Sequence, residues 1–186
     1  MPRYIAFLRG INVSGQKIIK MEELRKIFEG MKFPNVKTYI QSGNVIFDSS
    51  EKNAEKLTQK IEKGLVKALG YDVAVILRSK EEIAEIVTLD PFNISSGTLQ
   101  YKKTKAGDAK PYVVFVSLAP GNIPKLPMVS PKGDVEIVGV HKNTFFCLSH
   151  PLPNGTRGFP NAFIEKEFKI PATTRNWNTV NKVLEY

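Results

Sequence analysis

The first ninety residues alternate between short apolar runs and stretches in which apolar side chains recur at helical spacing. Residues 3–8 carry apolar side chains at odd and even positions alike after Arg3, which predicts a strand buried on both faces. Met21 to Met31 carries apolar side chains three and four positions apart and predicts an amphipathic helix. The other predicted elements are a hairpin of 38–41 and 44–47, a helix from Leu57 to Leu69 capped by Gly70, a strand 73–77 and a helix 80–87.

The hairpin contains Ser42-Gly43, which is a two-residue turn signal. Such a turn pairs Gln41 with Asn44 and Tyr39 with Ile46, so that these side chains share one face of the sheet. The aromatic motif typical of RNA-recognition sheets is absent from these strands. The sequence therefore disfavours RNA stacking on this sheet.

The second half repeats much of this pattern. Residues 111–118 predict a strand, and 135–140 with 144–148 predict a hairpin in which Asn143 tolerates the left-handed conformation of the turn. Four prolines between residues 120 and 131 argue against a long helix there. The remaining predicted elements are a helix 161–168, a short strand 172–174 and a final helix 178–185, with a linker at 93–109.

The order strand, helix, strand, strand, helix, strand is typical of a ferredoxin-like unit. The sequence therefore predicts an α+β fold of two ferredoxin-like units packed together, residues 1–92 and 110–186, with an added C-terminal helix. Because residues 3–8 and 73–77 do not alternate, both faces of the first sheet should be covered, by the second unit or by another subunit. A cleft between the units is the predicted ligand site, since pockets favour domain boundaries.

Charge adds a weaker signal. The 186-residue chain has a formal net charge of +9, and its densest basic segment contains Lys102, Lys103, Lys105 and Lys110. Such a segment is usually a solvated loop, so nucleic-acid binding ranks third among the functions considered. No apolar run is long enough for a signal peptide or a membrane span, which predicts a cytoplasmic protein with no membrane partner. We expect a monomer or a homodimer.

Two polar segments carry the candidate chemistry, one near each end of the chain. In 8–15 with 38–47, Arg, Asn, Gln and Gly stand directly beside apolar runs, and in 173–180 Arg and Asn do so. Arg suits anions, and Arg175 at a helix N-terminus would help to hold a phosphate or carboxylate. The competing interpretation is that these residues make turns and caps, with Thr174 or Asn176 as an N-cap and Trp177 in the core. The predicted ligand-binding residues are Arg9, Asn12, Lys20, Gln41, Asn44, Arg175 and Asn176.

Established catalytic and metal motifs are absent. Gly10 to Lys17 departs from the phosphate-binding loop GxxxxGK[ST] at both the lysine and the hydroxyl positions. His141 and His150 have no metal-ligand spacing to each other or to Cys147, so no metal and no cofactor are predicted. Cys147 is the single cysteine and is expected to be buried and inert. The sequence also allows the alternative of a catalytic dyad between Cys147 and either histidine. Catalytic residues are left unassigned.

Three ordered motifs resemble a known family. They follow the patterns LRGINV.G…K…M..L, TYIQSGNV.F and T.RNW.TV.K, and here they run from Leu8 to Leu24, from Thr38 to Phe47 and from Thr173 to Lys182. On these motifs the whole chain resembles the bacterial domain-of-unknown-function family 1697. The resemblance implies two ferredoxin-like units in one chain. It implies no reaction, because the family has no established one.

The leading functional prediction is a non-catalytic protein that binds a small anionic ligand, a phosphorylated metabolite or nucleotide, in the cleft. The alternative is an enzyme of unknown reaction that uses the same cleft. A buried titratable group with a shifted pKa beside a nucleophile or base would distinguish the two. The available candidates are His141, Cys147, Asp48 and Tyr39. Their scarcity favours binding.

Overall fold

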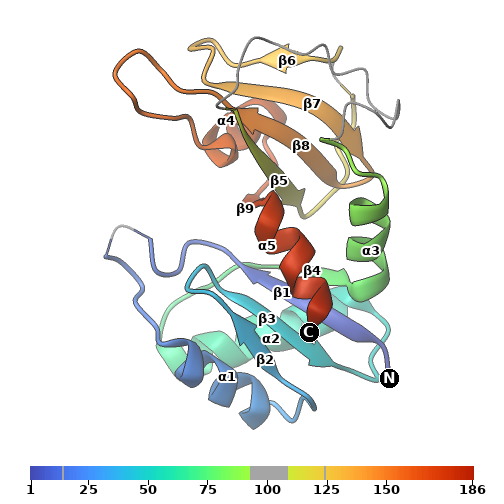
Figure 1. Cartoon of the computed structure of the whole chain (residues 1–186). Helices are drawn as coiled ribbons and strands as arrows, with labels where there is room; N and C mark the ends of the chain where they lie inside the picture. Colours follow the sequence, from blue (N-terminus) through green and yellow to red (C-terminus); the bar gives the residue numbers. More distant parts are fainter. Residues whose placement is uncertain (14, 93–108, 124) are drawn as a thin grey trace. The chain divides into compact units, whose positions relative to one another are not determined.

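The computed structural model describes residues 1–13, 15–92, 109–123 and 125–186. Over these residues the fold is mixed α+β, with two antiparallel sheets and five α-helices (Figure 1). The chain divides into two compact units. Unit 1 comprises Met1–Ala84 with Lys182–Tyr186, and unit 2 comprises Glu85–Asn181. Of the predicted linker 93–109, only Ala109 is among the described residues.

Unit 1 is built on a four-stranded sheet with the order β2-β3-β1-β4. Its elements are β1 (Arg3–Leu8), α1 (Met21–Gly30), β2 (Lys37–Tyr39), β3 (Asn44–Asp48), α2 (Ala54–Leu69) and β4 (Val75–Ser79). The predicted second helix is confirmed, and it begins earlier because Asn53 Oδ1 accepts a hydrogen bond from the Lys56 N–H at 2.9 Å. The helix ends at Gly70 as predicted, with the left-handed φ of 78° that glycine adopts readily.

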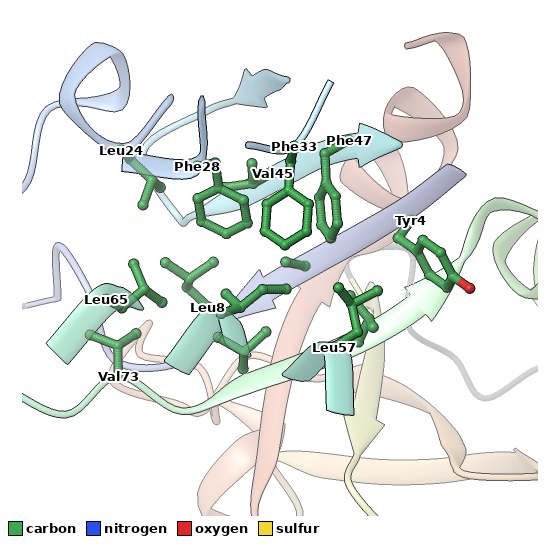
Figure 2. Close-up of a cluster of buried hydrophobic side chains, with 14 of the residues drawn as sticks. Tyr4, Leu8, Leu24, Phe28, Phe33, Val45, Phe47, Leu57, Leu65 and Val73 are labelled. Atoms are coloured by element: carbon green, nitrogen blue, oxygen red, sulfur yellow. The ribbon is translucent and has the colours of Figure 1, made fainter. Parts of the chain in front are cut away.

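The core of unit 1 lies between the sheet and both helices (Figure 2). Phe28 of α1 is fully buried, and its ring centroid lies 6.0 Å from that of Phe33 and 5.5 Å from that of Phe47. Burying such a side chain contributes about 1.5–3 kcal/mol. The apolar face of α1 is therefore held to β3 by aromatic packing, which places the loop before α1 at one end of the sheet.

The predicted pairing of the first hairpin is wrong. Tyr39 pairs with Asn44, and Lys37 pairs with Ile46, so the predicted pairs of Gln41 with Asn44 and of Tyr39 with Ile46 do not form. The connection consequently has four residues, 40–43, instead of two.

Asn44 and Gly43 explain the longer connection. The fully buried Asn44 side chain donates to Tyr39 O at 2.8 Å and to Ser42 Oγ at 3.1 Å. Gly43 has a φ of 76°, and a Cβ there would lie 2.5 Å from Cδ1 of Ile11. The turn is therefore fixed by side-chain hydrogen bonds and close packing rather than by the Ser-Gly dipeptide alone.

Strand β1 is buried on both faces, as its lack of alternation predicts. Ala6 and Leu8 belong to the core beside the helices. Ile5 and Phe7 point to the opposite face, and both are 0% exposed.

Unit 2 holds a five-stranded sheet with the order β6-β7-β8-β5-β9. Its strands are β5 (Lys110–Val116), β6 (Met128–Val129), β7 (Val135–His141), β8 (Thr144–Ser149) and β9 (Ala172–Asn176), and α4 (Pro160–Phe168) precedes β9. The β7–β8 hairpin is confirmed with its two-residue turn, but Lys142 takes a left-handed φ of 51° in the turn assigned to Asn143. Strand β9 reaches Asn176, two residues beyond the predicted end.

Each sheet is followed directly by a helix. α3 (Lys80–Thr88) follows β4, and the division between the units falls within it. α5 (Trp177–Lys182) follows β9 and continues as a 3-10 turn, Val183–Glu185. The predicted single helix 178–185 is thus divided, and its buried side chains include Val180 and Val183.

Candidate functional site

Asn12 organises the polar end of unit 1. Its Oδ1 accepts from the Ile19 N–H at 2.8 Å, and its Nδ2 donates to Ile19 O at 3.0 Å and to Gln41 O at 2.8 Å. These bonds join the loop after β1 to the turn between β2 and β3. Of the predicted binding residues, Asn12 and Gln41 are therefore in contact. The Asn12 amide makes hydrogen bonds that hold the loop and the turn together.

The other three predicted residues of unit 1 occupy different environments. Arg9 directly follows β1, is partly buried, and its backbone N–H donates to Ala74 O at 2.9 Å. Lys20 is exposed and precedes α1 as its N-cap residue. Asn44 is fully buried and holds the turn described above. Of the predicted binding residues in unit 1, Lys20 and Gln41 are thus the exposed ones.

Arg175 lies inside strand β9 rather than at a helix N-terminus. It pairs with Val113, and its Nη1 donates to Thr173 Oγ1 and Thr174 O, both at 2.9 Å. Burial lowers the pKa of the guanidinium to about 9 because the charged form loses its hydration. Arg175 is therefore built into the sheet, on the face opposite to that of its neighbour Asn176.

Arg78 occupies the matching position in unit 1 and was missed at the sequence level. It lies in β4, pairs with Ile5, and is 5% exposed. Its Nη1 donates to Leu77 O at 2.7 Å, and burial lowers its pKa to about 10, with Glu82 opposing the shift. The signal available in the sequence was one arginine inside an apolar strand, which is an uncommon placement for a charged side chain.

Asn176 is both the N-cap of a helix and a lining residue of a pocket. Its Oδ1 accepts from the Thr179 N–H at 2.7 Å and from Thr179 Oγ1 at 2.8 Å, which confirms its predicted role as N-cap of the last helix. The residue is exposed, and it lines a pocket of about 350 Å³ within unit 2. The lining residues are Lys110, Pro111, Tyr112, Asn176, Trp177 and Asn178.

Aromatic contacts fix two walls of this pocket. The Tyr112 ring meets Phe159 edge-on, with centroids 5.9 Å apart, and the Trp177 ring meets Phe92 edge-on at 5.2 Å. Such pairs contribute about 0.5–1.5 kcal/mol beyond the burial of area. Trp177 is only partly buried, so the expectation of a core tryptophan holds for part of its surface.

None of the titratable candidates for catalysis is among the described residues that line this pocket. Cys147 belongs to the apolar core of unit 2, and burial raises the pKa of its thiol, which suppresses the thiolate. His141 Nε2 lies 3.0 Å from Glu85 Oε1, and His150 Nε2 lies 2.9 Å from Glu136 Oε2. Each histidine is thus paired with a carboxylate.

The remaining two candidates also have structural partners. Asp48 Oδ2 accepts a hydrogen bond from Asn35 Nδ2 at 2.6 Å, and its other oxygen lies 3.5 Å from Arg3 Nη1. The Tyr39 ring packs on Tyr186 with centroids 5.5 Å apart.

Two features are absent from the described part of the chain. Among residues 1–13, 15–92, 109–123 and 125–186, no cluster of three or more His, Cys, Asp or Glu side chains is arranged to hold a metal ion. Within the same ranges no helix has the length and apolar character needed to cross a membrane. Lys102, Lys103 and Lys105 of the basic segment lie outside the described residues, whereas Lys110 begins β5.

Comparisons with known proteins identify similar chains of unknown function. The family model described as "Protein of unknown function (DUF1697)" matches residues 1–146. A solved structure of a conserved bacterial protein from Streptococcus pneumoniae is similar, with a TM-score of 0.66 and 19% sequence identity over 99% of this chain and 97% of that one. No curated protein matches. The structural likeness at this identity bears on the fold alone.

Proposed function

We propose, from the premise that this chain belongs to the DUF1697 family of proteins of unknown function, that it is a non-catalytic protein that binds a small anionic ligand. The observation that carries the proposal is the pocket lined by Lys110, Tyr112 and Asn176. It lies entirely within unit 2 and includes one of the residues predicted from the sequence.

The side chains of this pocket offer donors. Among the described residues that line it there is one lysine and no carboxylate. The Asn176 Oδ1 is used by Thr179, which turns the Nδ2 amino group away from the helix as a donor. The Tyr112 hydroxyl and the Trp177 indole N–H add two more donor groups. An ammonium among neutral donors favours an anion over a cation or a neutral ligand.

The size of the pocket limits the ligand. A volume of about 350 Å³ lies near the lower end of the range of about 300–1,000 Å³ that ligand pockets span. A phosphorylated metabolite or a single nucleotide suits this volume. The two aromatic walls additionally suit a planar group beside the anion.

Binding titrations with Asn176 variants test the proposal. The probes are inorganic phosphate and adenosine 5′-monophosphate, measured by calorimetry on the full chain. Asn176→Asp keeps an equally good N-cap but places a carboxylate in the pocket, so binding should weaken at least tenfold with an unchanged melting temperature. Lys110→Met should weaken binding by a similar factor, because a charged hydrogen bond contributes about 1.5–3 kcal/mol.

Lys132→Met is the matched control, since Lys132 is exposed in unit 2 and does not line the pocket. Equal affinity in the Asn176→Asp variant and the wild type would contradict the site. Failure of both probes to bind the wild type at millimolar concentration would contradict the function.

The enzyme and nucleic-acid alternatives stay predictions with less support. The raised pKa of the buried Cys147 thiol favours binding over catalysis, because it suppresses the thiolate nucleophile. Nucleic-acid binding through 102–110 would show as a gel shift that collapses between 50 and about 200 mM salt. Cytoplasmic location and oligomeric state likewise stay predictions.

The finer fold proposal is that both units follow the ferredoxin-like plan. In unit 1, the order of elements is strand, helix, strand, strand, helix, strand, and β1 lies between β3 and β4. In unit 2, β5 lies between β8 and β9 in the same way. In chain order, β6 stands between β5 and β7, where unit 1 has α1 between β1 and β2. An experimental structure with another strand order in either sheet would contradict the proposal.

A further inference from the structure

The two units differ at one position of their shared strand arrangement. Strands β7, β8, β5 and β9 follow the same neighbour order in unit 2 as β2, β3, β1 and β4 in unit 1, and α4 precedes β9 as α2 precedes β4. α1, which packs on α2 and β2, has no helical counterpart in the described part of unit 2. Between β5 and β7 the described residues form only the two-residue strand β6.

A pocket lies where a counterpart of α1 would pack. It has a volume of about 390 Å³ and is lined by residues 120–122, by Met128 of β6, and by Phe168 and Ile170 at the end of α4. Of these elements, α4 corresponds to α2, on which α1 packs in unit 1, and residues 120–122 follow β5 as the segment leading to α1 follows β1. Two more apolar side chains of this segment, Leu118 and Ile123, are 70% and 66% exposed.

Among the described residues, the apolar core cluster of unit 2 is smaller than that of unit 1. Sixteen buried residues form the core that α1 covers in unit 1, and Leu24 and Phe28 of α1 are among them. The corresponding cluster of described residues in unit 2 has eight, and Met128 is only partly buried against it. We propose that unit 2 carries a docking groove for an amphipathic helix of a protein partner, which occupies the position that α1 fills in unit 1.

Lysines close in sequence to the lining residues specify the partner further. Lys125, Lys166 and Lys169 are exposed and lie within three positions of a lining residue, against one lining carboxylate, Glu167. A helix with one apolar face and acidic flanks complements such lysines. Nucleic acid fits poorly, because Phe168 is the only aromatic side chain among the described lining residues and Glu167 places a carboxylate there.

Gly121 provides a clean way to fill the groove. A Cβ at Gly121 meets nothing within 4 Å, and its φ lies outside the left-handed range, so a larger side chain enters open space without backbone strain. Gly121→Trp should therefore occlude the groove while the fold stays intact. Gly30→Trp is the matched control, because Gly30 in unit 1 also has open space at its Cβ position and a normal φ.

The probe is a fluorescein-labelled peptide with the sequence of residues 21–31, blocked at both ends, which carries the apolar face of α1. Fluorescence anisotropy on the full chain should show saturable binding that Gly121→Trp weakens at least tenfold and Gly30→Trp leaves unchanged. Replacing the peptide's arginine and lysine by glutamate should tighten binding several-fold at low salt, and Lys125→Glu should reverse that gain.

Equal binding to the wild type and Gly121→Trp would overturn the proposal, since the peptide would then be exchanging with α1 or binding elsewhere. No binding at 1 mM peptide would overturn it as well. Dimerisation of the chain that Gly121→Trp abolishes would show that a second copy is the occupant, which also contradicts it. None of these results depends on whether the pocket beside Asn176 binds an anion.

Discussion

Units 1 and 2 place a buried arginine at the same point of the sheet but differ in the helices that cover the other face of that sheet. Arg78 pairs with Ile5 on the first strand of unit 1, and Arg175 pairs with Val113 on the first strand of unit 2. A capping residue follows each arginine, Ser79 before α3 and Asn176 before α5. The two units therefore share a detailed local design at the end of their last strand.

The difference lies on the helical side of each sheet. Unit 1 has α1 and α2 over its core, whereas α4 lies over the core of unit 2 without a counterpart of α1 in the described residues (Figure 1). Both units have the buried arginine and the capping residue, but they differ in the helices over the sheet. The sheet is therefore the part of the structure that the two units share. The proposed ligand pocket and the proposed docking groove both lie in unit 2, where the helical cover is smaller.

The largest expected effect comes from removing what α1 contributes. Phe28→Ala should lower the free energy of unfolding by about 3–5 kcal/mol, because it empties a fully buried aromatic position. Urea unfolding followed by circular dichroism measures the change. Val66→Ala on α2, where the side chain is 38% exposed, should change stability by less than about 0.5 kcal/mol. A loss below 1 kcal/mol at Phe28 would show that α1 is not integral to unit 1.

The two arginines offer a sharper comparison. Arg175→Ala should cost about 1–3 kcal/mol of stability, since it leaves Thr173 Oγ1 and Thr174 O without their donor. Arg175→Met should cost less, because it keeps the apolar stem and removes a charge that burial disfavours. The same order, Ala worse than Met, is expected at Arg78. The opposite order at either site would mean that the charge itself stabilises the sheet.

The caps should give smaller and nearly equal effects. Ser79 Oγ accepts from the Glu82 N–H at 3.1 Å, and Glu82 Oε2 accepts from the Ser79 N–H at 2.7 Å, which forms a capping box. Ser79→Ala and Asn176→Ala should each lower stability by about 1 kcal/mol in chemical denaturation. Asn176→Asp should be neutral within about 0.5 kcal/mol. A large loss in the aspartate variant would mean that Asn176 does more than cap α5.

The smallest expected effect concerns Glu85, at the point where unit 2 begins. Hydrogen bonds from Lys142 and His141 lower the pKa of this exposed carboxyl. A carboxyl group whose pKa is lowered by folding stabilises the protein at pH values above its ordinary pKa of 4.5. That contribution disappears as the pH falls through the pKa of the folded state. Melting temperatures between pH 6 and 3 should therefore fall less steeply in Glu85→Gln than in the wild type.

Local sequence patterns determined most of the elements. The apolar run 3–8 is a strand with the predicted ends, and α2 ends at the predicted Gly70 cap. α4 begins one residue before its predicted start, where Pro160 suits the first helical turn. These features depend on side-chain periodicity and on backbone preferences of single residues, which a sequence expresses directly. Asn176 as a cap belongs to the same class.

The tertiary structure decided register, burial of charge and the composition of the pocket. The first hairpin has a four-residue connection because buried Asn44 bonds to Tyr39 O, which a Ser-Gly dipeptide does not reveal. Arg175 became a strand residue because β9 pairs with β5 as far as Asn176. The same pairing brings Lys110 and Asn176, 66 positions apart in the sequence, to one pocket. Contacts between distant segments depend on how strands pair, and that pairing depends on the packing of the whole sheet rather than on any local run of residues.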